Sequence, residues 1–204
     1  MGRLVLCDAS GPLTDLIQKL SGEDAERWLE DLKKMLRKEK SREGLPVFKT
    51  IKLGTGLKTA DDFRKSLKDG GNRIGDWSND LLGKSEFANS VSKDEIGVDL
   101  VVLTTSQLTS KSGGTTAEVF AGAERLGLKK CSAEVGPQLR LQYKDQPLNE
   151  WLLIGMEPIR NSDGNLSVFN VARNDSELWL SSRYGYPVGV WDADDRWVFV
   201  RPRK

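Results

Sequence analysis

The stretch that most constrains the fold of this chain is residues 131–158, because the hydrophobic pattern changes its period there. Before it, apolar side chains recur mostly at helical spacing, and after it short apolar runs alternate with turn residues. Inside it, residues 151–156 form an apolar run between Pro147 and Pro158, which is typical of a buried strand. The pattern predicts an α+β fold, in which an N-terminal helical segment precedes a mixed domain that ends in an antiparallel β-meander.

The segment 137–143 inside this stretch has two interpretations. Three apolar side chains alternate there with Arg140 and a glutamine, and this period of two favours a half-buried strand. However, Pro137 suits the first turn of a helix, and Leu, Arg and Gln are good helix formers. A helix that begins at the proline is therefore the alternative, and the sequence leaves both open.

Residues 1–46 are predicted to form a separate N-terminal helical segment. A Ser-x-x-Asp capping pattern at Ser21 precedes apolar residues at helical spacing, which predicts an amphipathic helix. Its C-terminal end carries a basic run, residues 33–42, where the helix dipole favours cations. Because clustered cations can contact phosphates, nucleic-acid binding is an alternative function for this run. The residues that would carry it are Lys33, Lys34, Arg37 and Lys38.

Residues 47–204 are predicted to form one α+β domain, with a helix-rich half at 47–130 and an antiparallel sheet half at 131–204. Capping patterns at Thr59 and Thr115 open helices in the first half, and residues 87–93 are predicted to be a loop. In the second half, turn signals separate runs of β-forming residues. The expected strands are residues 47–53, 96–104, 152–159, 166–172, 177–181 and 196–201.

The chain contains no histidine, and this absence excludes several kinds of catalysis. Ser-His-Asp and Cys-His arrangements, His-based zinc sites and the usual general base near neutral pH all require that residue. The 2 cysteines, Cys7 and Cys131, lie far apart in the sequence, so an ordinary zinc site is excluded as well. We expect a protein without metal or cofactor, and the sequence favours a non-enzymatic function over an enzymatic one.

The charge balance and hydropathy predict a cytoplasmic protein. The chain has 31 basic and 30 acidic side chains, so its net charge of +1 gives no general attraction to nucleic acid or anionic membranes. It lacks a run of about eighteen apolar residues, and its N-terminus lacks the apolar length of a secretory signal. We expect no membrane association and two ordinary thiols rather than a disulfide.

Three aromatic residues in a loop after the expected meander are candidate binding residues. Tyr184, Tyr186 and Trp191 flank glycines and a proline that bend the chain. Such rings can contact a protein partner, bind a small ligand beside the nearby aspartates, or simply cover the open end of the sheet. The first hypothesis is a non-enzymatic interaction module that binds another protein through this aromatic loop, with Arg140 as a further binding candidate. The sequence also allows a homo-oligomer.

Carboxylates supply the alternative hypothesis, a hydrolase that works without histidine. Glycoside hydrolysis requires two carboxylates across a cleft, and Glu134 or Glu157 with Asp192 or Asp195 could supply them. Of these, Glu134, Asp192 and Asp195 are the candidate catalytic groups. Glu134 could instead form a salt bridge with Arg140, which would make it structural.

The run KKCSAEVGPQLRLQYKDQPLNEWLLIGMEPI, together with the ending RWVFVRPRK, resembles a group of conserved bacterial proteins of unknown function. The resemblance covers roughly residues 48–204 and leaves the N-terminal segment outside. It implies a bacterial origin. It implies no activity and no functional residues.

Overall fold

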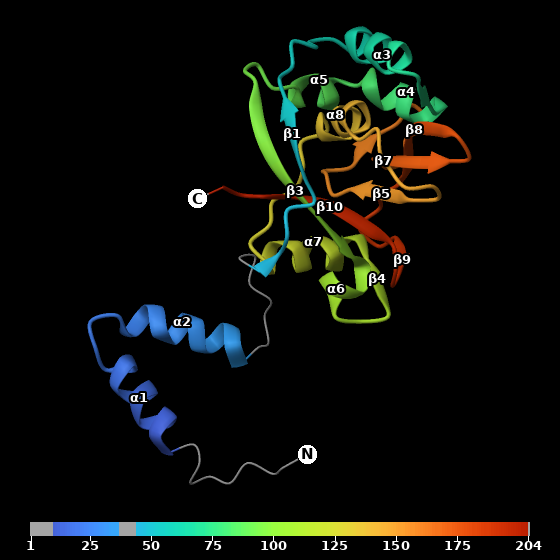
Figure 1. Cartoon of the computed structure of the whole chain (residues 1–204). Coiled ribbons are helices and arrows are strands. Elements are labelled where there is room, and N and C mark those ends of the chain that lie inside the picture. Colours follow the sequence, from blue (N-terminus) through green and yellow to red (C-terminus); the bar gives the residue numbers. More distant parts are fainter. Residues whose placement is uncertain (1–9, 37–43, 204) are drawn as a thin grey trace. The chain divides into compact units, whose positions relative to one another are not determined.

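The computed structural model describes residues 10–36 and 44–203, and the chain divides into two compact units, Met1–Ser41 and Arg42–Lys204. In the first unit, α1 (Ser10–Leu20) and α2 (Ala25–Leu36) pack against each other (Figure 1). The ammonium of Lys19 lies 4.3 Å from the centroid of the Trp28 ring, which joins the two helices. The helices predicted for the N-terminal segment are therefore present.

The second unit is built on a large mixed sheet with the strand order β1-β3-β10-β5-β7-β8-β2, to which β6 adds along β7. β7 pairs antiparallel with both β5 and β8, which is the predicted meander. β10 pairs antiparallel with β3 and parallel with β5, so it joins the two parts of the sheet. The strands are β1 (Lys49–Leu53), β2 (Asn72–Ile74), β3 (Ile96–Thr104), β5 (Trp151–Ile154), β6 (Ile159–Arg160), β7 (Leu166–Asn174), β8 (Glu177–Tyr184) and β10 (Arg196–Arg201). The α+β fold class is confirmed.

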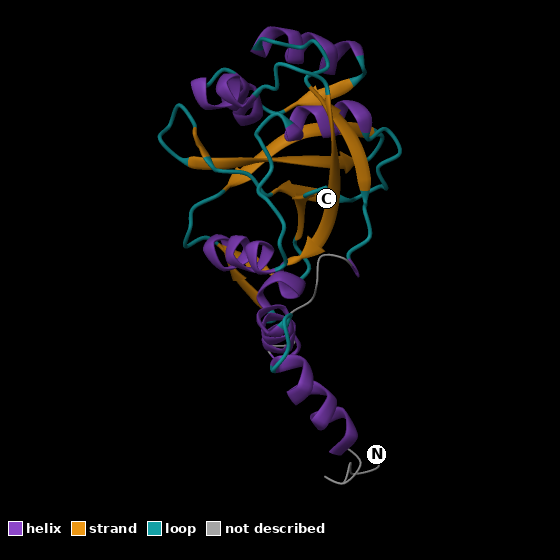
Figure 2. Ribbon diagram, turned by 90° about the vertical axis from the view of Figure 1, so that its left-hand side faces the viewer, coloured by secondary structure: helices purple, strands orange, loops and turns teal. Residues whose placement is uncertain are grey.

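Helices cover both faces of this sheet (Figures 1 and 2). One face carries four helices, α3 (Ala60–Asp69), α4 (Asp76–Leu82), α5 (Ser85–Ser90) and α8 (Val135–Gln142). The other face carries α6 (Thr105–Thr109), α7 (Thr116–Arg125) and a small ribbon in which β4 (Gly113–Thr115) pairs with β9 (Val190–Asp192). Phe120 of α7 packs edge-on against Trp197 and Phe199 of β10, so the core continues through the sheet.

Capping boxes fix the starts of three helices. Thr59 and Thr115 each accept a backbone hydrogen bond from the acidic residue three positions on, and that residue bonds back to the cap, as the sequence predicts. A third box begins α6 at Thr104, where a glutamine takes the place of the acid. These reciprocal bonds satisfy backbone donors that the first turn of a helix leaves free.

The segment 137–143, for which the sequence favoured a strand, is the helix α8. Residues 135–140 are all buried, including Gln138 and Arg140. A helix that is buried on every side shows no amphipathic period, so its spacing imitates a strand. Gly136 allows the close approach, because a Cβ there would lie 2.8 Å from the Cβ of Phe169 in β7. The predicted loop at 87–93 is likewise partly wrong, since it begins inside α5.

Asp99 of β3 ties the edge of the sheet to the C-terminal residues. Its carboxylate accepts hydrogen bonds from Arg203 at 2.8 and 3.0 Å and from Thr50 of β1 at 2.6 Å. The Arg203 guanidinium, followed by the Thr50 hydroxyl, lowers the pKa of Asp99 to about 2 from 3.8.

This lowered pKa predicts a loss of stability in acid. A carboxyl group whose pKa is depressed by folding stabilises the protein above its unfolded pKa, and that contribution disappears as the pH falls from about 4 to about 2. We expect Asp99→Asn to be about 1 kcal/mol less stable than wild type at pH 6, because solvent screens part of the interaction. Near pH 2, where half of the native Asp99 carboxyl groups are protonated, most of this difference should be lost. Urea denaturation at both pH values measures the difference, and a gap as large at pH 2 as at pH 6 would contradict the assignment.

Candidate functional site

Four exposed apolar side chains of the second unit lie between the end of β8 and the start of β9. Tyr184, Tyr186, Val188 and Val190 occupy alternate positions and are 60%, 37%, 80% and 78% exposed. We call residues 184–190 the apolar loop. Single exposed apolar residues are common on protein surfaces, but a contiguous group is typical of an interaction site.

The backbone of the apolar loop is fixed at both ends and in the middle. Gly185 donates a 2.8 Å hydrogen bond to the carbonyl of Leu166 in β7. The carbonyls of Pro187 and Gly189 each accept a 3.0 Å bond from the first turn of α7. Gly185 also lies close to Val168, since a Cβ there would be 2.9 Å from a methyl carbon of that side chain. These contacts fix the backbone conformation of the apolar loop.

The two tyrosines of the apolar loop lie together. Their ring centroids are 6.3 Å apart, and the rings are tilted by 43°. The hydroxyl of Tyr186 donates a 2.7 Å hydrogen bond to the side-chain oxygen of Asn165, which fixes one ring. Tyr184 makes no hydrogen bond through its hydroxyl within the described part of the chain, and it is the more exposed of the two.

Trp191, the third predicted binding residue, belongs to the interior instead. It is half-buried in β9, and its ring packs edge-on against Trp197 at a centroid distance of 4.8 Å. Its indole N–H donates a 2.8 Å hydrogen bond to the hydroxyl of Thr116. The structure thus separates Trp191 from the two tyrosines. The exposed residues near the two tyrosines in the chain are instead Val188 and Val190, which the sequence analysis did not identify.

Glu134 is fully buried at the start of α8 and holds two distant loops. One carboxylate oxygen accepts a 2.8 Å hydrogen bond from the N–H of Gly54, and the other accepts one of 2.8 Å from the N–H of Ser92. The side chain of Gln138 donates a further bond of 3.2 Å. With these bonds the carboxylate serves the packing of the fold and does not face solvent.

Arg140 is also fully buried, and it forms no salt bridge with Glu134. Its guanidinium donates to the carbonyl of Tyr143, to the side-chain oxygen of Gln146 and, at 3.3 Å, to the carbonyl of Ala172. Burial lowers the pKa of this guanidinium to about 10 from 12.5, so it is charged at neutral pH. The structure places it out of reach of a partner on the surface.

Asp192 and Asp195 lie together at the turn between β9 and β10, on the face of the sheet opposite to α8. The N–H of Asp192 donates a 2.9 Å hydrogen bond to the carboxylate of Asp195. Burial raises the pKa of Asp195, although that hydrogen bond acts in the opposite direction. Both aspartates line one cavity, whereas Glu134 lies on the other side of the sheet.

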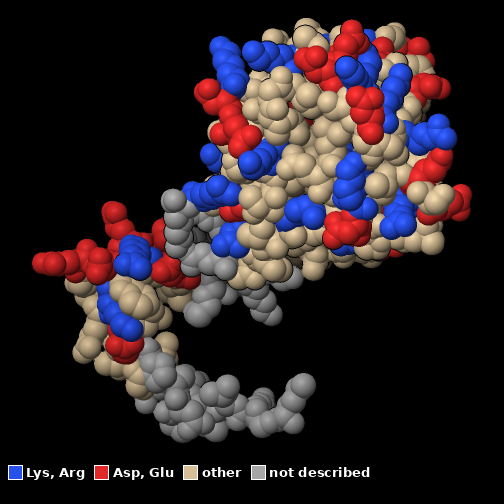
Figure 3. Space-filling model, turned by 45° about the horizontal axis from the view of Figure 1, so that its top comes forward, with Lys and Arg blue, Asp and Glu red and all other residues tan. Residues whose placement is uncertain are grey.

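The basic run of the N-terminal unit is described in part. Lys33 pairs with Glu30 at 2.8 Å, whereas Arg37, Lys38 and the side chain of Lys34 lie outside the described residues. On the face of the second unit drawn in Figure 3, basic and acidic side chains are interspersed. That face therefore lacks the one-sided positive charge that long nucleic acids require.

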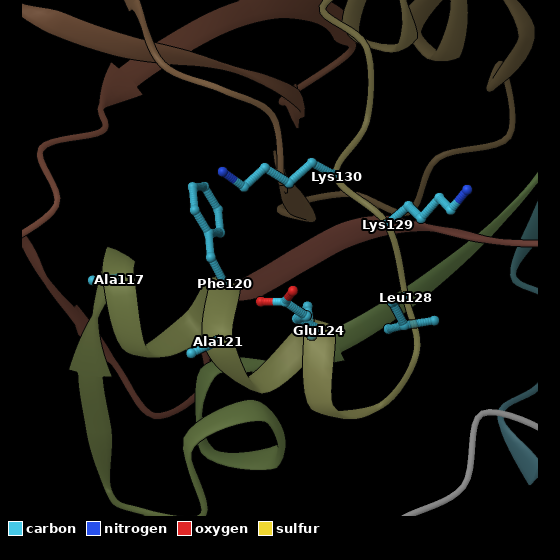
Figure 4. A pocket seen from close by; sticks show the side chains of 8 residues that line it. Ala117, Phe120, Ala121, Glu124, Leu128, Lys129 and Lys130 are labelled. Carbon is cyan, nitrogen blue, oxygen red and sulfur yellow. The ribbon is translucent and has the colours of Figure 1, made fainter.

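A second hollow lies along α7 (Figure 4). Its volume is about 500 Å³, similar to the 520 Å³ of a hollow beside Leu148 that is lined by residues 147–151 and 194–196. Here the ammonium of Lys130 lies 4.8 Å from the centroid of the Phe120 ring and 2.5 Å from a carboxylate oxygen of Glu157. Lys130 therefore already has its partners, and Lys129 points in the opposite direction (Figure 4), so the two cations do not converge on a ligand.

Among the residues that the structure describes, no helix combines the length and apolar character needed to cross a membrane. The same residues hold no cluster of three or more candidate ligand side chains placed to bind a metal ion. No protein-family model, curated protein or solved structure matches this chain.

Proposed function

We propose that this chain is a non-enzymatic interaction module of the bacterial cytoplasm, which binds a partner protein through the apolar loop. The observation that carries the proposal is the exposure of four apolar side chains at alternate positions of a loop with a fixed backbone. Burying them in an interface would remove apolar surface from water at roughly 25 cal/mol per Å².

The fixed backbone supports this proposal. When a loop becomes ordered only on binding, the loss of its conformational entropy weakens the affinity. A loop that is already ordered has a much smaller entropy cost. Tyrosine is also enriched at protein interfaces, because its ring is large and has few rotatable bonds. Arg183 before the loop and Asp192 after it are both exposed, and they provide a charged rim of both signs. The partner we expect has an apolar patch with a mixed-charge border.

The test is the double variant Tyr184→Ala with Val188→Ser, which removes two of the four apolar side chains, neither of which makes a side-chain hydrogen bond to any described residue. The matched control is Trp77→Ser, because Trp77 is 42% exposed on α4, outside the apolar loop. Tagged full-length chains are purified from the native host, the retained proteins are identified by mass spectrometry, and each is then expressed alone. Calorimetry with the purified partner should show binding at least about 100-fold weaker for the double variant and unchanged for the control.

A partner that binds both variants equally would contradict the proposal. Light scattering across a range of concentrations provides a second check. If wild type dimerises and the double variant does not, a second copy of the chain covers the apolar loop, and the proposal of a different partner protein fails. Circular dichroism of each variant shows whether the fold is intact.

A further inference from the structure

A cavity of about 300 Å³ lies against the sheet face opposite to α8, separate from the exposed tips of the apolar loop. Its floor comes from β5 and β7, and its walls come from β8, from β9 with the turn that follows it, and from the first residue of β10. It adjoins the hollow beside Leu148, and both are lined by Trp151, Asp195 and Arg196. Its volume is at the lower end of the range for small-molecule sites.

Asn170 lines this cavity and is 1% exposed. Within the described part of the chain, neither the oxygen nor the nitrogen of its carboxamide has a hydrogen-bond partner. Its neighbour Phe169 packs toward α5 and α8, so strand alternation directs Asn170 to the face that holds the cavity. An unpaired buried polar group is unfavourable, and the carboxamide of Asn170 presents both a donor and an acceptor to a ligand.

Charged groups of both signs line the same cavity from different elements. Arg183 of β8 lies over the ring of Trp151, with its central carbon 4.9 Å from the ring centroid, and among the described residues no carboxylate lies within 4.0 Å of it. Asp192 and Asp195 line the cavity from the turn after β9. Arg196 differs, because Glu150 pairs with it at 2.5 Å. The unpaired cation and the two carboxylates suit a ligand that carries both charges.

We propose that this cavity binds a free α-amino acid. Arg183 would pair with its carboxylate, since the guanidinium fork matches two carboxylate oxygens. Asp195, assisted by Asp192, would accept hydrogen bonds from its ammonium group. The carboxamide of Asn170 can donate to the carboxylate and accept from the ammonium, and Trp151 offers an apolar surface to the side chain. The proposal does not rest on partner binding by the apolar loop, although the cavity shares Arg183 and Asp192 with the charged rim of that loop.

The first measurement is calorimetry of the full chain with each of the common amino acids in turn, and with glucose as a neutral polyol. We expect at least one amino acid to bind and glucose not to bind. For that amino acid, two analogues are then compared, the α-amide, which lacks the carboxylate, and the des-amino acid, which lacks the ammonium. Each should bind at least about 10-fold more weakly, because each leaves one charged wall unpaired.

Variants locate the site. Arg183→Gln should weaken binding of the amino acid at least about 10-fold and leave binding of the α-amide unchanged. Asp195→Asn should also weaken binding of the amino acid at least about 10-fold, and it should leave binding of the des-amino acid unchanged. The matched controls are Arg73→Gln on β2 and Asp163→Asn in an exposed turn, which change the same charges away from the cavity. Thermal unfolding of all four establishes that they are folded.

Three results would overturn the proposal. The first is that no amino acid binds at concentrations up to about 10 mM. Titration to this concentration detects any Kd below about 10 mM. The second is that the cavity variants bind the amino acid as well as their controls do. The third is that glucose or the α-amide binds as tightly as the amino acid, since a zwitterion would then not be recognised.

Discussion

Replacing Arg140 with methionine is expected to lower the free energy of unfolding by about 3 kcal/mol. Methionine fills a similar volume and carries no charge, so it removes the cost of burying the guanidinium. It also leaves three oxygen acceptors without their donor, on Tyr143, Gln146 and Ala172. Each buried acceptor that loses its bond costs about 1–3 kcal/mol, which exceeds the gain from removing the charge.

The control for this prediction is Arg73→Met on β2. Its guanidinium is 63% exposed and pairs with Glu177 at the surface, so the substitution should change stability little. Urea denaturation followed by tryptophan fluorescence measures both variants. If Arg140→Met is as stable as the control, then the buried guanidinium is not needed to join α8 to the sheet.

Replacing Glu134 with glutamine is expected to destabilise the fold by about 2–3 kcal/mol, although the two side chains have the same shape. The N–H groups of Gly54 and Ser92 each donate to one of its two carboxylate oxygens. A glutamine keeps one oxygen and places an NH₂ group where the other oxygen was. The N–H of Gly54 or of Ser92 would then face this NH₂ group and lose its acceptor. Glu134→Ala should cost still more, since it also opens a cavity.

The matched control is Glu157→Gln, whose side chain is 79% exposed and pairs with Lys130. Its effect on stability should be small. The comparison separates a structural carboxylate from a catalytic one, because active-site acids can often be replaced without loss of stability. Unchanged urea denaturation of Glu134→Gln would contradict the structural role and return Glu134 to the candidate catalytic residues.

Much of the fold follows from local patterns. The capping boxes at Thr59 and Thr115 need residues three positions apart, and both helices are found where the sequence places them. The strands β3 and β10 are bounded as expected, because their β-rich runs end at turn residues. What local patterns cannot supply is the order of the strands, since the pairing of β10 with β3 and β5 joins segments far apart in the sequence.

The candidate site shows the same limit. Tyr184, Tyr186 and Trp191 look alike in sequence, yet the packing of Trp191 on Trp197 decides which of them face solvent. The alternation of large apolar residues through Val188 and Val190 was visible, but it can be read as a strand with one buried face. Asn170 lies in an apolar run, and nothing in the residues around it indicates a cavity.

The central place of β10 has a consequence for how the chain can fold during synthesis. Residues 196–201 leave the ribosome after the other strands of the sheet, yet they join the β1–β3 pair to the rest of the sheet. Until then the nascent chain holds two sheet fragments, each with an open edge of the kind that pairs wrongly with other chains. Helical parts can form early, but the main core must wait for its last strand. Chaperones that bind extended apolar segments would therefore be most needed just before β10 leaves the ribosome.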